Sequence, residues 1–155
     1  MDISKLLASF NERKVRYVVI GATAFPLYGY VRTTLDLDIF IEPTLANARR
    51  TIAALRKFGY DTAELTAKEL LARKTLFRQY ELDTDIHPFA AGAEFKQIWK
   101  NSVVGTIDGV SVHIVSLDDM IRMKVAAGRA KDRLDLKALR ALRSRSQDRK
   151  TSRGE

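Results

Sequence analysis

The sequence has no cysteine and only two histidines among its 155 residues. The absence of cysteine excludes disulfide bonds, thiol nucleophiles and thiolate metal sites. Two histidines are too few for the usual structural zinc sites, which draw four ligands from cysteine and histidine. The composition therefore argues against a disulfide scaffold, a thiol enzyme and a structural zinc domain.

Long hydrophobic runs are also missing. No apolar stretch approaches the roughly 20 residues that a membrane-spanning helix needs. The first residues do not combine a basic segment with an apolar core, so we predict no signal peptide. We therefore expect a cytoplasmic protein with no membrane partner.

The basic charge is concentrated near the end of the chain. Residues 121–155 carry 12 of the 27 basic and 4 of the 19 acidic side chains, and thus the whole net charge of +8. Such a segment favours a polyanionic partner, such as an NTP, RNA or an acidic protein. The alternative is a solvated helix followed by a short basic tail.

Hydrophobic periodicity predicts alternating helices and strands. Helices are predicted over 2–13, 22–28, 44–58, 66–73, 94–100, 117–127 and 130–143, and strands over 15–20, 35–41, near Tyr60, within 75–88, and over 103–107 and 110–115. Asp108-Gly109 between the last two strands is a strong hairpin signal, and Ser116 is a suitable helix cap. This order predicts an α/β (α+β) fold.

We find no linker that would divide the chain. Hydrophobic residues make up 46% of the sequence, which suits one compact domain of this length. Residues 144–155 lack apolar side chains, and we expect them to form a disordered basic tail. The predicted domain therefore covers residues 1–143.

Asp36 and Asp38 lie two positions apart in the predicted strand LDLDIFI, so both carboxylates project from the same face. Two anions this close repel each other and are costly to desolvate, and a divalent cation relieves that cost. Mg²⁺ prefers carboxylate oxygens, and paired metal ions serve phosphoryl and nucleotidyl transfer. Taken singly, an Asp-x-Asp pair is more often a solvated strand edge.

Two neighbouring patterns strengthen the metal hypothesis. Upstream, the strand–glycine–helix sequence VVIGATAF would point backbone N–H groups at a triphosphate. Downstream, ELDTDIH places Glu81, Asp83, Asp85 and His87 on one face of another strand. Asp85 and Asp83 are competing candidates for the third carboxylate, and the physics of the sequence hardly separates them. His87 precedes a proline and is expected to be structural or exposed.

The segment YVVIGATAFPLYGYVRTTLDLDIFIE resembles the signature of the polymerase-β-like nucleotidyltransferases: a glycine pair or Gly-Ser, a short helix, and two aspartates between hydrophobic residues. GYVRTT (29–34) resembles the G-x-x-R-x-T bridge of a bacterial subgroup that includes AbiEii-type toxins. GRAKDRLDLKAL (128–139) resembles the C-terminal motif of that subgroup. The resemblance implies a mixed sheet flanked by helices, with further helices at the C-terminal end.

The resemblance also implies a metal site. Asp36 and Asp38 would bind two Mg²⁺ ions, for which Mn²⁺ is a possible substitute. Asp85 would hold the catalytic ion and help to deprotonate the acceptor hydroxyl.

A nucleotide-binding set is implied as well. The backbone of Gly21 and Ala22 would cradle the β- and γ-phosphates. Arg32 and Lys124 are candidate phosphate contacts; the alternatives are a surface arginine and a solvated lysine.

The implied activity is transfer of a nucleoside monophosphate from an NTP to an acceptor hydroxyl, with release of pyrophosphate. RNA, such as a tRNA end, is the preferred acceptor and a protein is the second. A toxin–antitoxin system with a cognate toxin or antitoxin is a further implication. An aminoglycoside-like small-molecule transferase is less favoured, because we see neither a second domain nor an acidic acceptor pocket.

The family usually has Gly-Gly or Gly-Ser where this chain has Gly21-Ala22. Alanine keeps the backbone donors but offers no hydroxyl to a phosphate. The alternative function is therefore a catalytically weak binding module, acting as an antitoxin or regulatory partner. In the C-terminal motif, Lys131, Asp132 and Asp135 are expected to support the last helix rather than to line the active site.

Overall fold

The computed structural model describes residues 3–28, 36–79 and 82–153. Its strands are β1 (Tyr17–Ile20), β2 (Asp36–Ile41), β3 (Thr75–Phe77), β4 (Asp83–His87), β5 (Val103–Ile107) and β6 (Val110–Ile114). Its helices are α1 (Ile3–Glu12), α2 (Leu45–Phe58), α3 (Ala67–Ala72), α4 (Phe95–Asn101), α5 (Leu117–Ala127) and α6 (Arg133–Arg153), with 3-10 turns η1 (Ala22–Tyr28) and η2 (Ala130–Asp132). Within these residues, no helix is both long and apolar enough to cross a membrane.

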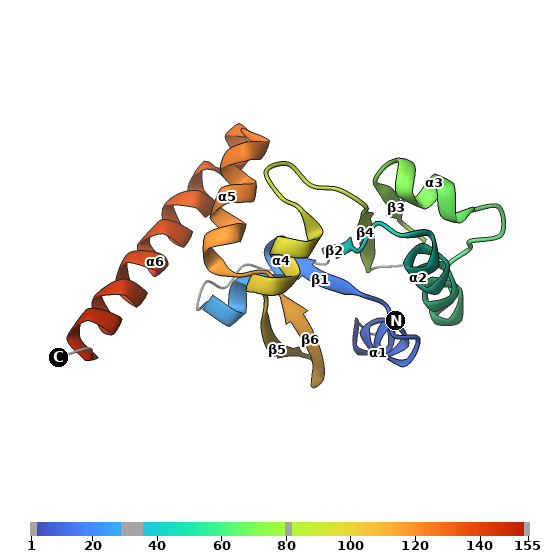
Figure 1. Cartoon of the computed structure of the whole chain (residues 1–155), viewed down its shortest axis with the longest axis horizontal. Helices are drawn as coiled ribbons and strands as arrows, with labels where there is room; N and C mark the ends of the chain where they lie inside the picture. Colours follow the sequence, from blue (N-terminus) through green and yellow to red (C-terminus); the bar gives the residue numbers. More distant parts are fainter. Residues whose placement is uncertain (1–2, 29–35, 80–81, 154–155) are drawn as a thin grey trace.

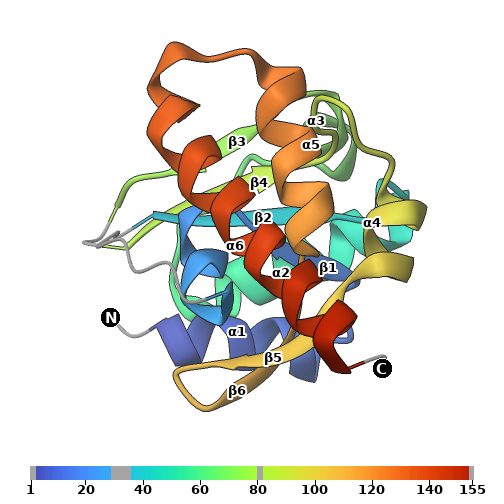
Figure 2. The same ribbon diagram turned by 90° about the vertical axis from the view of Figure 1, so that its left-hand side faces the viewer.

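The strands form one mixed sheet in the order β3-β4-β2-β1-β6-β5. β2 pairs in parallel with β4, and β1 pairs in parallel with β6, whereas the other neighbours are antiparallel. Helices α1 and α2 lie on one side of this sheet, and α4, α5 and α6 lie on the other (Figures 1 and 2). The expectation of an α/β fold with a mixed sheet flanked by helices is confirmed.

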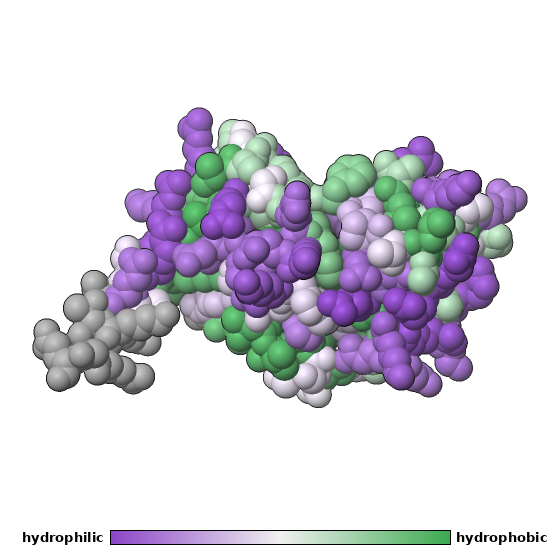
Figure 3. Space-filling view, in the orientation of Figure 1, coloured by the Kyte–Doolittle hydropathy of each residue, from purple (hydrophilic) through white to green (hydrophobic). Residues whose placement is uncertain are grey.

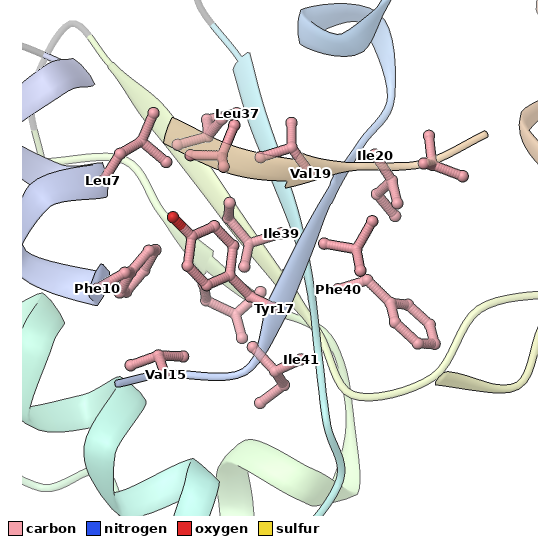
Figure 4. Packing of buried hydrophobic residues seen from close by; sticks show 14 of the residues in the cluster. Leu7, Phe10, Val15, Tyr17, Val19, Ile20, Leu37, Ile39, Phe40 and Ile41 are labelled. Carbon is pink, nitrogen blue, oxygen red and sulfur yellow. The ribbon is translucent and has the colours of Figure 1, made fainter. Parts of the chain in front are cut away.

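The central strand β2 has two different faces. Leu37, Ile39 and Ile41 are fully buried on the side of α1 and α2. Figure 4 shows Ile39 beside Tyr17 and Phe10, whose rings lie 5.1 Å apart. Because side chains alternate along a strand, the aspartates of β2 must project from the opposite face.

The predicted helix ends are largely confirmed. Thr44 and Ser116 accept hydrogen bonds from Asn47 and Asp119 and so cap α2 and α5. Gly128 ends α5 in the left-handed conformation.

The predicted strand near Tyr60 is wrong. The backbone N–H of Tyr60 bonds to the carbonyl of Leu55, which completes the C-terminal cap of α2. Its ring packs 5.0 Å from Phe77, and its hydroxyl donates to the carbonyl of Leu82. Burial of the ring thus explains the apolar signal that resembled a strand.

The C-terminal segment differs from the sequence prediction in two ways. Instead of a disordered tail from Ser144, helix α6 continues to Arg153, because these residues include good helix formers and no glycine or proline. Among the leucines of α6, Leu139 is buried but Leu134 is 78% exposed. The visible surface of α6 is mainly hydrophilic (Figure 3). The division of the chain at residue 143 stays a prediction.

A buried asparagine joins three segments at the end of the sheet away from Gly21. The amide nitrogen of Asn47 donates to the carbonyls of Arg16 and Glu42, at 2.9 and 3.0 Å. Its amide oxygen accepts from the backbone N–H of Arg16 at 2.8 Å. This one side chain therefore fixes the entry to β1, the exit from β2 and the start of α2.

We predict that Asn47→Ala lowers the free energy of unfolding by about 2–4 kcal/mol, because three partly buried backbone groups lose their partner and a buried side chain is removed. Urea unfolding monitored by circular dichroism measures the change. Gln97→Ala, at an exposed position of α4, serves as the control and should change stability by less than about 0.5 kcal/mol. Equal stabilities of the two variants would contradict this role for Asn47.

Candidate active site

The pairing of β2 with β4 brings the acidic residues together. The parallel register sets Asp36 opposite Asp83 and Asp38 opposite Asp85. Because these positions share one face of the sheet, four carboxylates gather on two adjacent strands. The structure thus places the predicted third carboxylate beside the first pair. Glu81, also predicted on this face, lies outside the described residues.

Asp38 and Asp85 form a group with His87 that has metal-binding dimensions. One ligand atom from each of the three residues lies within 4.8 Å of the others. The Nε2 atom of His87 is 2.8 Å from Oδ1 of Asp38. Opposite ligands of Mg²⁺ lie about 4 Å apart, so small side-chain movements would close this oxygen–nitrogen donor set around one divalent ion. The set supports Asp85 over Asp83 as the third carboxylate.

His87 was expected to be merely structural or exposed, and its direct contact with Asp38 was not foreseen. The only signal in the sequence was its alternation with Asp83 and Asp85 along ELDTDIH. The contact between His87 and Asp38 depends on the register in which β2 pairs with β4, and the sequence does not specify this register.

Arg78 is a second residue that the sequence did not reveal. It follows β3 directly, and its Nη1 atom donates to Oδ1 of Asp85 at 2.6 Å. Its Nε atom lies 3.6 Å from Oδ2 of Asp83. The hydrogen bond to Asp85 is the largest influence that raises the pKa of Arg78. A permanent positive charge therefore lies within the acidic group.

Asp36 lies at the exposed beginning of β2. Partial burial raises its pKa, and the negative charges of Asp83 and Asp38 raise it further. The acidic neighbours therefore add to the effect of burial, and Arg78 opposes it. A bound cation would favour the ionised carboxylate.

Gly21 makes the closest approach to the acidic strand. Its φ angle is +75°, and a Cβ atom at this position would lie 2.5 Å from Oδ2 of Asp38. Next to it, the hydroxyl of Thr23 donates to the carbonyl of Asp36 at 2.7 Å. The turn therefore needs glycine for its conformation and for its contact with Asp38. Ala22, the other predicted phosphate-binding residue, begins η1 immediately afterwards.

The remaining nucleotide-binding candidates are Arg32 and Lys124. Arg32 lies outside the described residues. Lys124 is only 11% exposed, and its Nζ atom lies 3.2 Å from Asp132 and 3.6 Å from Asp135. It is thus not the solvated lysine of the alternative interpretation. Its role as a phosphate contact stays a prediction.

Lys124, Arg129, Asp132 and Asp135 form a charge cluster that joins α5 to η2 and α6. Burial favours a higher pKa for Asp132, but hydrogen bonds from Arg129 and Lys124 outweigh it and hold that pKa below its ordinary value. Lys131, which the sequence suggested as a member, is exposed. The geometry supports the predicted structural role of the C-terminal motif, with Lys124 and Arg129 as its cations.

Comparison with known families gives one match that spans most of the chain. Residues 1–148 match the model of a family described as "Nucleotidyltransferase of unknown function (DUF6036)". No protein of curated function has a significantly similar sequence.

Solved structures with the same fold include two antibiotic-modifying enzymes. The lincomycin-bound lincosamide antibiotic adenylyltransferase LnuA is 17% identical with a TM-score of 0.60, and the match covers 92% of this chain and 98% of that chain. The solution structure of the antibiotic-resistance factor ANT(2'')-Ia is 18% identical with a TM-score of 0.61, covering 97% of this chain and 91% of that chain. A crystal structure of ANT(2'')-Ia with adenylyl-2''-tobramycin is 20% identical, with a TM-score of 0.58 and coverage of 93% and 96%. At these identities the likeness establishes the fold.

We predict that Gly21→Ala weakens Mn²⁺ binding by about tenfold or more, because the added methyl group displaces the carboxylate of Asp38. Titration with Mn²⁺, monitored by electron paramagnetic resonance of the free ion, measures the affinity.

Gly109→Ala is a matched control for backbone strain. Gly109 has a similar φ of +78°, but a Cβ atom there would meet nothing within 4 Å. Both variants should lose about 1 kcal/mol of stability, whereas only Gly21→Ala should lose metal affinity. Equal Mn²⁺ affinities would show that the contact with Asp38 does not matter for the metal.

The Asp132 cluster predicts a stability difference that depends on pH. Because the pKa of Asp132 is lower in the folded protein, its stabilising effect is present above about pH 4 and is lost as pH falls through the folded pKa. Asp132→Asn should therefore lower stability by about 2–3 kcal/mol at pH 7, and by progressively less at lower pH.

Urea unfolding at pH 7 and below pH 4 tests this dependence. Asp118→Asn, at a mainly exposed position of α5, should cost less than about 1 kcal/mol at either pH. If the free energies of unfolding of the wild type and Asp132→Asn differ by the same amount at both pH values, the ionised form of Asp132 is not the source of the stability.

Proposed function

This chain belongs to the nucleotidyltransferase family whose model it matches over residues 1–148, and we propose that it is a metal-dependent enzyme that transfers a nucleoside monophosphate from an NTP to an acceptor hydroxyl. The observation that carries the proposal is the group of Asp38, Asp85 and His87 beside the turn at Gly21. These three residues offer donor atoms for a metal ion, and Gly21 lies directly beside Asp38, in the order that the family signature describes.

Asp38 and Asp85 are the residues that would hold a divalent ion, with Asp36 as a further ligand for a second one. When bound, Mg²⁺ or Mn²⁺ would neutralise phosphate charge and polarise the reacting groups. His87 fixes the orientation of the Asp38 carboxylate through its 2.8 Å contact. The donor set fits these hard cations because most of its atoms are carboxylate oxygens.

In the proposed reaction, the acceptor oxygen attacks the α-phosphorus of the NTP. A new oxygen–phosphorus bond forms, the bond to the bridging α–β oxygen breaks, and pyrophosphate leaves. Asp85 accepts the proton of the hydroxyl group, as a general base on the same face as Asp38. The backbone N–H groups at Gly21 and Ala22 hold the β- and γ-phosphates, with Arg32 and Lys124 as further proposed contacts.

RNA, such as the end of a tRNA, is the acceptor that the charge distribution favours. Helix α6 presents a series of exposed basic side chains, including Arg133, Lys137, Arg140 and Arg145. Such a helix would bind a phosphodiester backbone and position the terminal hydroxyl. A protein acceptor is the next proposal. Either activity would take place in the cytoplasm and would suit a toxin–antitoxin system with a cognate partner.

A small-molecule acceptor is the second candidate, and two observations favour it. The chain covers 98% of LnuA, so the expected second domain is not needed for this type of enzyme. A groove of about 530 Å³ is lined by Phe40 and Pro88, which are close in sequence to Asp38 and His87. The groove also includes Glu42 and Glu94, and its volume lies in the range of ligand sites.

We predict that label from an α-³²P NTP passes to the acceptor in the presence of Mg²⁺ or Mn²⁺. Asp36→Asn and Asp38→Asn should each reduce the rate by at least about a hundredfold, because each removes a proposed metal ligand. Asp85→Asn should reduce the rate more than Asp83→Asn. Each variant is assayed with total RNA, with cell protein, and with lincomycin or tobramycin.

Asp108→Asn is the control, because Asp108 is exposed in the β5–β6 turn. It should retain full activity and confirm that loss of an acidic group alone is harmless. Label on RNA or on the antibiotic decides between the two acceptor classes. A folded wild-type chain that binds NTP but labels no acceptor would favour the alternative function, a catalytically weak binding module or antitoxin, which Ala22 in place of serine also supports.

A further inference from the structure

Both central carboxylates of the site are contacted by nitrogen atoms. Nε2 of His87 lies 2.8 Å from Asp38, and Nη1 of Arg78 lies 2.6 Å from Oδ1 of Asp85. Nε of Arg78 also lies 3.6 Å from Asp83. The guanidinium group therefore lies between two of the four acids, where it neutralises the charge that a metal ion would otherwise neutralise.

Arg78 and Asp85 differ in their freedom to move. The side chain of Arg78 is 44% exposed, whereas that of Asp85 is 14% exposed and belongs to a strand with partners on both sides. Arg78 lies just beyond the end of β3, where the ladder with β4 has ended. Asp85 is thus held in place by the sheet, while the half-exposed guanidinium can turn into solvent once its Nη1 hydrogen bonds to Asp85 and to the carbonyl of Phe77 break.

We propose that Arg78 has two alternating partners: Asp85 in the metal-free site, and the triphosphate of the NTP once a metal ion has replaced it at Asp85. The inference rests on the proposed nucleotidyltransferase function and adds a specificity-determining residue to it. The guanidinium lies 2.6 Å from the Asp85 carboxylate and repels a second cation at that group, so Arg78 and a metal ion compete for the negative charge of Asp85.

The chemistry of arginine suits the second partner. Guanidinium remains charged at every physiological pH, and its planar donors match two phosphate oxygens at once. Once released from Asp85, it would still lie beside the metal site, where the phosphates must bind. Arg78 therefore links the two binding events: metal binding frees the group that strengthens NTP binding, and by reciprocity NTP favours the metal-bound site.

The linkage predicts opposite effects of one substitution. Arg78→Ala should raise the affinity for Mn²⁺ about three- to tenfold without nucleotide, because a competing cation is removed. The same variant should lower the affinity for NTP about tenfold at saturating Mn²⁺, because a charged phosphate contact is lost. Arg78→Lys, which keeps the charge but not the planar donors, should give smaller changes of the same signs.

The experiment uses the full chain and two binding assays. Free Mn²⁺ is measured by electron paramagnetic resonance, and nucleotide affinity by calorimetry with the α,β-methylene analogue of the NTP that the wild type binds best. These analogues bind without turnover, so neither assay depends on the identity of the acceptor. Arg73→Ala removes an equal charge from an exposed residue at the end of α3 and should change neither affinity.

Each outcome decides the proposal. Tighter Mn²⁺ binding together with weaker nucleotide binding in Arg78→Ala supports it. Unchanged or weaker Mn²⁺ binding overturns it and leaves Arg78 as a residue that only positions β4. Tighter Mn²⁺ binding with unchanged nucleotide affinity overturns it as well. A wild-type chain that binds neither Mn²⁺ nor any of the four analogues contradicts the proposed function itself.

Discussion

The parallel pairing of β2 with β4 is the constraint on which the site depends. It places four carboxylates on one face of adjacent strands, while the opposite face of β2 is fully buried in the core. The burial of Leu37, Ile39 and Ile41 offsets the repulsion among the acids and prevents β2 from moving away. The cation at Arg78, the contact with His87 and the turn at Gly21 are arranged around this fixed acidic face.

The two charge clusters of the described residues differ in how their acids are matched by cations. In the C-terminal cluster, two buried acids are matched by Lys124 and Arg129, and the pKa of Asp132 falls. Among the described residues, four acids on the β2–β4 face meet one arginine and one histidine, and burial together with the neighbouring acids raises the pKa of Asp36. Close acids with few cations among them suit a cation site, whereas a balanced cluster mainly holds helices together.

The sequence predicted the parts of the site that depend on short-range patterns. Alternation along the strand predicted that Asp36 and Asp38 share a face, and alternation along ELDTDIH predicted a third acid on a further strand. The strand–glycine–helix pattern predicted the turn at Gly21. Contacts between distant segments were missed: Arg78 with Asp85, His87 with Asp38, and Lys124 with Asp132. These contacts depend on strand register and helix packing, which composition and periodicity do not specify. The apolar signal at Tyr60 was likewise due to tertiary burial of its ring.

The acceptor cannot be inferred from the fold, because the same sheet supports different transfers. In the proposed reaction, the acidic face and the glycine turn act on the NTP. The acceptor must instead bind to a surface outside this centre. Two such surfaces differ in their chemistry. The basic side chains of α6 suit a long polyanion, whereas the groove between Phe40 and Trp99 has the volume of a small ligand and carries both signs of charge. A polyanion gains affinity from many weak phosphate contacts along a helix, so the length of α6 beyond Ser144 argues for RNA over a compact acceptor.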